Sequence, residues 1–386
     1  MIDVILTENI PIKLWLDDAN EDTLKQARNL ANLPFAFSHV ALMPDAHVGF
    51  GMPIGGVLAT KQAIIPNAVG VDIGCGMCAV RTNIEHIEKK ELKNIMSIIR
   101  GMIPIGFKWH KHKQTPHLLP TDMAKHSIIS QEYEQSLYQL GTLGGGNHFI
   151  EIQKGSDKKI WVMIHSGSRN LGKKVAEHYN KTAKILNSKT CGTVPPNWDL
   201  AYLPLDTTVA QHYIDEMNYC VAFALANRKL MMERVCTSVS EVFKNAEFDN
   251  PIDIAHNYAS FETHFGEQVW VHRKGATSAI KGRKCIIPGS QGSKSYIVEG
   301  LGNQQSFKSC SHGAGRKLGR NQAVKTLNYK NEVALLESKN IVHSIRSLRD
   351  LEEAAGAYKN IETVMENQAD LVKILIELEP MAVIKG

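Results

Sequence analysis

The sequence lacks the features that would place the protein in a membrane or a secretion pathway. No apolar run approaches the length that a bilayer requires, and Met1 is followed by charged segments rather than by a signal peptide. The seven cysteines are odd in number and scattered in spacing, which disfavours a disulfide framework. These absences predict a cytoplasmic protein whose thiols stay reduced and free for packing or metal binding.

Repeats and the common nucleotide-binding signatures are also missing. We find no internal repeat, coiled-coil heptad or low-complexity tract. The glycines between positions 51 and 56 are not part of a Gly-Lys-Ser/Thr loop, so a P-loop is excluded. Gln291 interrupts the glycine-rich segment 288–292, which therefore departs from the Gly-x-Ser-x-Gly pattern of a nucleophile elbow. Nucleotide binding, if present, must use another arrangement.

Composition and charge are those of an ordinary globular chain. The 386 residues are 43% hydrophobic and 22% charged, which allows a large core in one domain or two coupled ones. The net charge of +5 is compatible with a polyanionic partner but does not require one. Two basic clusters suit either solvated loops or a surface that contacts phosphates: Lys108, His110, Lys111, His112 and Lys113, and Lys281, Arg283 and Lys284.

The pattern of apolar residues predicts strands that carry glycine-rich loops, packed with helices. Helical spacing is expected over residues 20–32, 86–100, 128–140, 171–186 and 206–243, the last being the longest. Apolar runs predict strands at 40–43, 149–152 and 159–164. We therefore expect an α+β fold with a mixed β-sheet core and flanking helices.

Two local expectations concern loops. The first apolar run is expected to stop at Pro44, because residues 44–56 are dense in glycine and proline. Residues 106–125 are polar and rich in histidine, so they are expected to form a surface excursion from a single domain that spans 1–386.

Six short segments place glycine next to metal-binding or ionisable side chains. Glycine lets backbone N–H groups approach a ligand closely, so six such segments predict one assembled site for metal and phosphate. The segments are 44–47, 70–76, 144–149, 165–169, 288–292 and 309–316.

Asp72 and Cys75 lie three residues apart on a glycine-rich turn and can face one cation. A thiolate with imidazole partners favours a borderline transition metal, and the added carboxylate admits Mn²⁺ or Zn²⁺. A turn cap at Asp72 and a small buried side chain at Cys75 explain the same pattern. Cys78 would complete a Cys-x-x-Cys pair, but no helix is expected to follow and lower a thiol pKa, which disfavours a redox role.

Three histidines lie beside strand ends or glycine turns. His148 follows three glycines and one asparagine, whereas His165 and His256 each end an apolar run. A fixed backbone with the ring at a sheet edge suits metal ligation, although each histidine alone is more often a hydrogen-bonded structural residue. Together with Asp72 and Cys75 they favour a metal site.

His312 lies in a turn rich in serine and glycine, four residues before Arg316. Imidazole can act as a base, a ligand or a nucleophile. The intervening backbone N–H groups and the guanidinium of Arg316 are suited to binding phosphate. A histidine that is simply held in a tight turn is the alternative.

In these segments the sequence resembles the RtcB RNA-splicing ligases, from about residue 6 to Gly386. The resemblance is carried by the six segments, by 303–320 with its Ser-His-Gly-Ala-Gly-Arg motif, and by the C-terminal Val-Ile-Lys-Gly. It implies an α+β ligase that joins a 2′,3′-cyclic phosphate or 3′-phosphate RNA end to a 5′-hydroxyl end, in tRNA splicing or RNA repair. It also implies GTP and two Mn²⁺ ions, with an archease-like activating protein as a conceivable partner.

The resemblance also implies residue roles. His312 is expected to carry GMP and pass it to the RNA 3′-phosphate, and the 5′-hydroxyl then displaces GMP from the activated RNA-3′-pp-5′-G end. Cys75 is expected to bridge two metals, whose ligands are implied to be Asp72, Cys75, His148, His165 and His256. GTP contacts are implied for Asn147, Glu151, Ser290, Ala314, Gly315, Arg316, Tyr358 and Lys385.

Guanine selection is chemically reasonable with this set. Glu151 can accept hydrogen bonds from the N1 and N2 donors of guanine, and Lys385 can donate to O6. Arg169 and Arg316 are expected to meet RNA phosphates or the triphosphate. Gly319 departs from the family, since many members carry serine there, and this departure bears on RNA choice more than on the central chemistry.

Two other functions fit part of the pattern. A metal-dependent RNA phosphoesterase or cyclic phosphodiesterase would use the same ligands without ligation, but it needs neither a nucleotide carrier such as His312 nor a guanine reader such as Lys385. A catalytically silent RNA-binding module would have no use for the intact set of metal-binding side chains.

Overall fold

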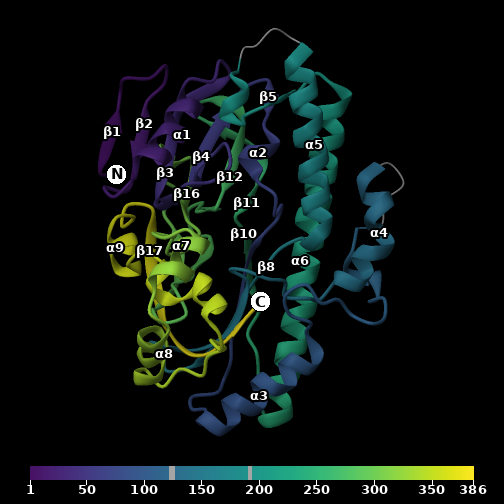
Figure 1. The fold of residues 1–386 in the computed structure, drawn as a ribbon, viewed down its shortest axis with the longest axis vertical. Helices are drawn as coiled ribbons and strands as arrows, with labels where there is room; N and C mark the ends of the chain where they lie inside the picture. The colour runs from purple at the N-terminus through teal and green to yellow at the C-terminus, as the bar shows by residue number, and fades with distance from the viewer. Residues whose placement is uncertain (121–126, 190–193) are drawn as a thin grey trace.

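A computed structural model of the chain describes residues 1–120, 127–189 and 194–386. Two β-sheets form its centre, with helices around them, which confirms the α+β prediction (Figure 1). The first sheet has six strands in the order β1 (Asp3–Ile5), β2 (Ile12–Leu14), β3 (Ala36–His47), β4 (Ile54–Thr60), β12 (Glu267–Lys274) and β11 (Asn257–His264).

The second sheet has seven strands and carries most of the candidate site. Its order is β10 (Ile252–Ala255), β6 (Gly76–Arg81), β8 (Ile160–Ser166), β7 (Phe149–Gly155), β17 (Val372–Lys385), β15 (Ser295–Gly300) and β14 (Lys284–Ile287). All six pairings within it are antiparallel. Two short pairs complete the strands: β5 (Ala63–Ile64) with β9 (Leu203–Pro204), and β13 (Ala276–Ser278) with β16 (Ser309–Ser311).

The two sheets pack against each other across an apolar core. Met43 and Val57 of the first sheet belong to the same buried cluster as Met77 and Met163 of the second. Burial of such side chains contributes roughly 1.5–3 kcal/mol each. The sandwich therefore fixes the strand ends from which the glycine-rich loops emerge.

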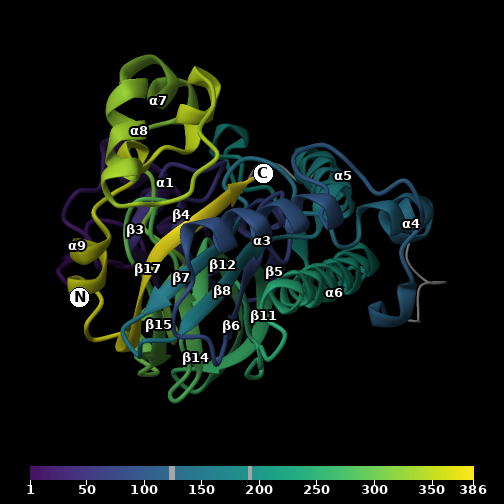
Figure 2. The same ribbon diagram turned by 90° about the horizontal axis from the view of Figure 1, so that it is seen from below.

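Helices cover the outer faces of the sandwich and one of its sides (Figures 1 and 2). Helix α1 packs on the first sheet, whereas α3 and α6 cover the outer face of the second, and α5 lies alongside α6. Their bounds are α1 (Glu21–Ala31), α2 (Pro66–Val69), α3 (Lys89–Met102), α4 (Ser127–Gln139), α5 (Arg169–Lys189), α6 (Thr208–Val242), α7 (Arg320–Thr326), α8 (Tyr329–Ser338) and α9 (Ile361–Glu366).

The helices expected from apolar periodicity are present, with shifts of a few residues at their ends. Helix α1 begins after Asn20, the first residue of the expected range, whose side chain accepts a hydrogen bond from the N–H of Thr23 and caps the helix. Helix α6 is the longest helix among the described residues, as predicted, and extends over 35 residues.

One strand prediction was wrong at its C-terminal end. Strand β3 continues through Pro44 and Asp45 to His47 instead of stopping at Pro44. Its pairing with β4 is irregular between Leu42 and His47, and such an irregularity tolerates a proline that cannot donate to the ladder. Asp45 is therefore held on a strand inside the sandwich, not on a mobile loop.

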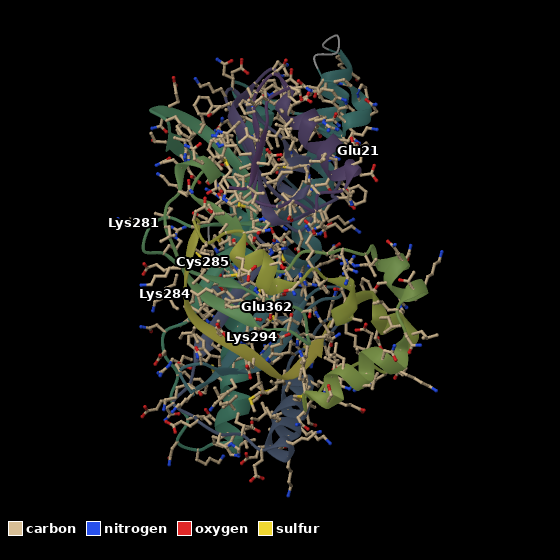
Figure 3. The ribbon with its side chains drawn as sticks, turned by 90° about the vertical axis from the view of Figure 1, so that its left-hand side faces the viewer. Glu21, Lys281, Lys284, Cys285, Lys294 and Glu362 are labelled. Atoms are coloured by element: carbon tan, nitrogen blue, oxygen red, sulfur yellow. The ribbon has the colours of Figure 1, made fainter. Side chains whose placement is uncertain are left out.

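The described part of the histidine-rich segment, residues 106–120, is mostly exposed coil with a short 3-10 helix at Pro116–Leu118; residues 121–125 lie outside the described residues. The second basic cluster is also exposed, and Lys281 and Lys284 lie at the edge of the molecule (Figure 3). The six cysteines within the described residues are free thiols, and Cys191 lies outside them. Among the described helices, none combines the length and apolarity needed to cross a bilayer.

Candidate functional site

The five predicted metal-binding side chains converge at one end of the second sheet. Cys75 Sγ lies 3.4 Å from Nε2 of His148 and 3.2 Å from Nε2 of His165. Nε2 of His148 is 3.0 Å from Oδ2 of Asp72, and Nε2 of His165 is 3.3 Å from Nε2 of His256. Side chains up to 184 positions apart in sequence thus form one continuous cluster.

Adjacent strands and one turn bring these side chains together. Phe149 pairs with His165 between β7 and β8, so His148 and His165 lie next to each other. The N–H of His256 donates to the carbonyl oxygen of Cys75 at 2.8 Å, which fixes the end of β10 beside the turn that carries Asp72 and Cys75. Gly167 is required for this approach, because a Cβ there would lie 2.2 Å from Oδ1 of Asp72.

Helix α6 holds the turn and the sheet together through a buried guanidinium. Arg228 donates to the carbonyl oxygens of Gly74 at 2.9 Å and Ser166 at 3.0 Å. It also pairs with Asp253 on β10, with Nη2 2.6 Å from Oδ1. One residue of α6 therefore links the turn that carries Asp72 and Cys75, the end of β8 and strand β10.

Backbone carbonyls orient two of the imidazoles toward the cluster. Nδ1 of His148 lies 3.0 Å from the carbonyl oxygen of Leu143, and Nδ1 of His165 lies 3.1 Å from that of Asn147. A carbonyl accepts only an N–H, so the contact at His165 favours the tautomer whose Nε2 lone pair faces Cys75, whereas His148 has an acceptor at each ring nitrogen, the Leu143 carbonyl and Oδ2 of Asp72. Arg169 also lies 3.1 Å from Nδ1 of His148 and can donate there only in the other tautomer, when Nε2–H faces Asp72.

Burial gives the cluster the electrostatics of a cation site. Burial lowers the pKa of both His165 and His256 far below the ordinary value, so their rings are neutral at pH 7. Burial raises the pKa of the Cys75 thiol, and the charge of Asp72 raises it further. Burial alone would raise the pKa of Asp72, but its hydrogen bond to His148 and the charges of His148 and Arg169 bring it below its usual range.

His312 adjoins this cluster on the side of the first sheet. Its ring centroid lies 4.8 Å from that of His256. Nδ1 of His312 is 2.6 Å from Oδ2 of Asp45, and the same oxygen accepts from the N–H groups of His312 at 3.1 Å and Gly313 at 3.2 Å. Gly315 allows this close approach of segments, because its φ is +73° and a Cβ would lie 2.2 Å from the Asp45 carbonyl oxygen.

The predicted residues Arg316 and Tyr358, together with Arg320, which had no predicted role, surround the carboxylate of Glu353. Arg316 Nη1 donates to Oε2 at 3.0 Å, Arg320 Nε donates to Oε1 at 3.1 Å, and the hydroxyl of Tyr358 donates to Oε2. Burial would raise the pKa of Glu353, but the charges of Lys385 and Arg316 lower it. The cationic side chains here are held in fixed positions.

Glu151 and Lys385 lie on neighbouring strands, β7 and β17. Burial raises the pKa of Glu151 to about 7, against the opposing charge of Lys385, and burial lowers the pKa of Lys385. A cavity of ≈ 80 Å³ beside Lys385 is lined in part by Gly146, Glu353 and Gly386.

The remaining predicted residues lie on turns around these groups. Asn147 contributes its backbone carbonyl to His165, and Ala314 is buried beside Gly315. Ser290 bonds Ser293 within its own turn, at 2.9 Å between the hydroxyl oxygens. The neighbouring Gln291 donates to the Glu353 carbonyl oxygen at 2.9 Å, which connects that turn to the Glu353 group.

Sequence reasoning missed three residues that organise the site. Asp45 lies in the segment 44–47, for which the sequence predicted a loop and no role for this carboxylate. Arg228 was hidden in the apolar periodicity of α6, where a buried arginine is a signal in itself. Glu353 lies in a 3-10 segment, Leu348–Glu353, with no motif around it.

Comparisons with known proteins agree along the whole chain. Residues 26–125 and 120–386 match the family described as tRNA-splicing ligase RtcB. The RNA-splicing ligase RtcB of Escherichia coli K12 is 37% identical, over 100% of this chain and 99% of the relative. The tRNA-splicing ligase RtcB of Nanoarchaeum equitans is 34% identical over 98% of this chain and 96% of its own length, and that of Thermococcus kodakarensis is 32% identical over 98% and 95%.

Proposed function

Because this chain belongs to the RtcB family of RNA-splicing ligases, we propose that it is a GTP-dependent RNA ligase with Mn²⁺ at the Cys75 cluster. It joins a 2′,3′-cyclic phosphate or 3′-phosphate RNA end to a 5′-hydroxyl end, in tRNA splicing or RNA repair. The single observation that supports this most strongly is the position of His312. Its ring lies against a metal-ligand histidine, and its Nδ1 is engaged by Asp45.

The donor set fits a pair of divalent transition metals. The ligand atoms of Cys75, His148 and His165 lie within 4.8 Å of one another, and Asp72 and His256 extend the group on either side. One thiolate with three imidazoles favours a borderline transition metal, and the carboxylate of Asp72 admits Mn²⁺. A buried thiol of raised pKa ionises when a cation offsets the cost, which is consistent with Cys75 as the bridging ligand. When bound, the metals neutralise charge on phosphate oxygens.

His312 is suited to carry the nucleotide. Oδ2 of Asp45 accepts a hydrogen bond from Nδ1–H of His312. The proton is therefore on Nδ1, and the lone pair of Nε2 is left as the nucleophile. In the proposed first step Nε2 forms a bond to the α-phosphorus of GTP and pyrophosphate leaves. A 2′,3′-cyclic phosphate end is first opened by water to the 3′-phosphate. An oxygen of the 3′-phosphate then takes the GMP from Nε2 of His312. The 5′-hydroxyl oxygen finally attacks the RNA phosphorus as its proton passes to solvent, and GMP leaves.

Guanine recognition and triphosphate binding are assigned to the surrounding groups. We assign Glu151 and Lys385 to the guanine edge, because a carboxylate and an ammonium match the donors and the O6 acceptor of guanine. Arg316 and Tyr358, held by Glu353, are assigned to the nucleotide together with the turns of Asn147, Ser290, Ala314 and Gly315. An archease-like activating protein and a cytoplasmic location are part of the same proposal.

A phosphoesterase that lacks ligation is not favoured. Hydrolysis of a cyclic phosphate needs metals and water, but neither a nucleotide carrier such as His312 nor a guanine reader such as Lys385. The relatives that cover this chain almost completely are named as RNA-splicing or tRNA-splicing ligases.

Radiolabelled GTP tests the proposal directly. The protein is incubated with Mn²⁺ and GTP labelled at the α-phosphate, and covalent label is measured after denaturation. We expect label on the wild type and on His178→Ala, an exposed histidine of α5, and none on His312→Ala. Absence of label from the wild type, together with hydrolysis of a cyclic phosphate RNA, would support the phosphoesterase instead.

A further inference from the structure

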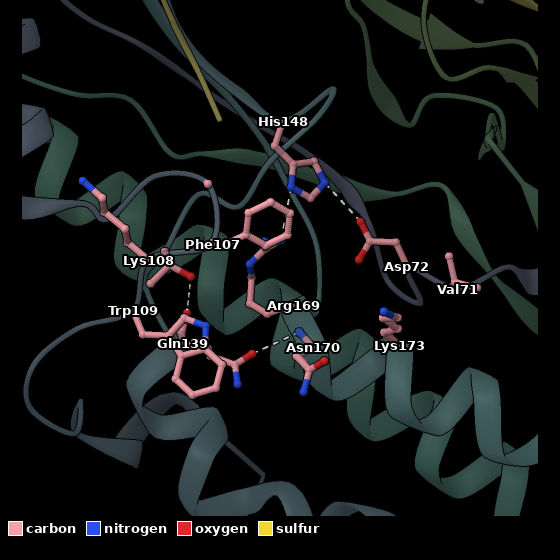
Figure 4. Close-up of a pocket in the computed structure, with 12 residues that line it drawn as sticks. Val71, Asp72, Phe107, Lys108, Trp109, Gln139, His148, Arg169, Asn170 and Lys173 are labelled. Carbon is pink, nitrogen blue, oxygen red and sulfur yellow. Dashed lines mark hydrogen bonds and ion pairs between the residues drawn. The ribbon is translucent and has the colours of Figure 1, made fainter. Parts of the chain in front are cut away.

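The cavity beside the candidate metal centre has an aromatic rim that the roles assigned so far do not use. It measures ≈ 370 Å³, within the range of roughly 300–1,000 Å³ that is usual for ligand sites. Asp72 and His148 form one part of its wall, and Phe107 and Trp109 form another (Figure 4). The cavity is therefore continuous with the metal-binding cluster.

Two aromatic rings are unusually accessible here. Phe107 is 95% exposed and Trp109 is 46% exposed. Both residues lie in the coil that begins at residue 106, outside the apolar core. Core packing therefore does not explain why aromatic side chains occupy these positions. An exposed ring has a large apolar face that can stack with a nucleobase, whatever the base identity.

The charges around the rings favour an anionic ligand. Lys108, Arg169 and Lys173 line the same cavity, whereas Asp72 is the one carboxylate among its lining residues. Arg169 lies deepest of the three cations, in contact with His148. A ligand with a phosphate toward Arg169 and a base toward the rim matches this distribution of charge and apolar surface.

We propose that Phe107 and Trp109 form a base-stacking subsite that holds the terminal nucleotides of a single-stranded RNA end in register with the metal cluster. The inference rests on the proposed RNA ligation and assigns a substrate-positioning surface to the segment that begins at residue 106. The rings hold the bases, the three cations neutralise the backbone, and the terminal phosphate or hydroxyl reaches the cluster formed by Asp72 and His148.

Fluorescent oligonucleotides test the subsite. Short RNAs carry 2-aminopurine next to a 3′-phosphate in one set and next to a 5′-hydroxyl in another, so quenching identifies the strand end that is stacked. We expect Phe107→Ala with Trp109→Ala to raise the Kd for the responding RNA by about tenfold per ring and to remove the quenching. As single replacements, Phe107→Tyr should keep the Kd of the wild type because the ring remains, whereas Phe107→Leu should raise the Kd.

A matched control uses another exposed aromatic ring. Phe261 is 58% exposed and lines a separate cavity on β11, so Phe261→Ala should bind RNA as the wild type does. An unchanged Kd in the double variant, or an equal loss in Phe261→Ala, would overturn the subsite.

Labelling of His312 with GMP, measured on the same proteins, separates this inference from the proposed function. A double variant that is labelled normally but binds RNA weakly supports the subsite. A labelled wild type whose double variant binds RNA normally refutes the subsite and leaves the ligase proposal intact. An unlabelled wild type that still quenches the RNA probe in a Phe107-dependent manner refutes the ligase proposal alone.

Discussion

The carboxylate of Asp45, on β3 of the first sheet, accepts a hydrogen bond from Nδ1 of His312 at 2.6 Å. Asp45 is fully buried, and the same oxygen also holds the N–H groups of His312 and Gly313. This pair connects the first sheet to the candidate metal-binding cluster of the second. It selects the imidazole tautomer in which Nε2 is free.

Replacing Asp45 should therefore impair GMP transfer without removing the nucleophile. We expect Asp45→Ala to slow His312 labelling by about 10²- to 10⁴-fold, the range associated with a positioned proton acceptor. Asp45→Asn should slow the labelling less than Asp45→Ala does, because an amide oxygen still accepts a hydrogen bond from Nδ1–H. Single-turnover labelling measures both rates, and equal rates in Asp45→Ala and the wild type would contradict the assigned tautomer.

Two neighbouring cysteines provide a matched test of the metal centre. Cys75 and Cys78 are both buried, but only Cys75 lies among the proposed ligands. Cys75→Ala should abolish tight Mn²⁺ binding and labelling, whereas Cys78→Ala should keep both. Calorimetric titration with Mn²⁺ gives the affinities. Full ligation by Cys75→Ala at ordinary Mn²⁺ concentrations would rule out a bridging thiolate.

Selection of guanine depends on Glu151 in this account. Glu151→Gln replaces an acceptor by a group that also donates, so we expect KM for GTP to rise by about 10- to 100-fold, as for loss of a hydrogen bond to a charged group. The same variant should discriminate less strongly between GTP and ATP. Glu379→Gln, an exposed position on β17, is the control. If KM for GTP is the same in both variants, Glu151 does not read the base.

The stability of the metal-free protein should fall in acid because of buried histidines outside the site. Burial lowers the pKa of His39 and of His272 to about 4, from 6.5. Between pH 6.5 and pH 4 these histidines bind protons in the unfolded chain but not in the native state. The free energy of unfolding is therefore highest above pH 6.5 and declines as the pH falls toward 4. The loss is up to about 3 kcal/mol per histidine.

Denaturant unfolding at several pH values measures this decline. Ile65 N–H donates to Nε2 of His272 at 3.0 Å, and a glutamine oxygen can accept the same bond, so His272→Gln should unfold with a shallower pH dependence. An identical slope in variant and wild type would show that His272 titrates normally.

RNA binding should weaken with salt, and the cavity cations should set part of the slope. For single strands log K falls by about 0.7 per phosphate contact for each unit of log salt. Lys108→Gln with Lys173→Gln should therefore reduce the slope by about 1.4. The second basic cluster, formed by Lys281, Arg283 and Lys284, gives the control. Lys281→Gln with Lys284→Gln should leave the slope of log K against log salt unchanged. A flat salt response in the wild type would contradict a cationic RNA surface.

Sequence patterns predicted the fold class and the elements because their causes are local. The apolar period of α6 and the apolar runs of β7 and β8 are visible in short windows. The ends of elements depend on partners instead, and β3 passes through Pro44 only because β4 pairs with it irregularly. Local windows do not contain that information.

The candidate site was predictable in its residue types and less so in its architecture. Glycine beside Asp72, Cys75 and His312 indicated ligands and a nucleophile, and the family resemblance gave their roles. The sequence held no local signal that Asp45 would face His312 across 267 positions, or that Arg228 would link two strands. Those contacts arise from the packing of two sheets and a helix.

The central claim is that the five ligands and His312 form one site around a metal pair. Anomalous diffraction from crystals soaked with Mn²⁺ and GTP tests it most directly. The account predicts two Mn²⁺ peaks that share Cys75 Sγ, with continuous density from Nε2 of His312 to the α-phosphorus. Peaks bound elsewhere, or a nucleotide whose α-phosphorus lies out of reach of His312, would contradict it.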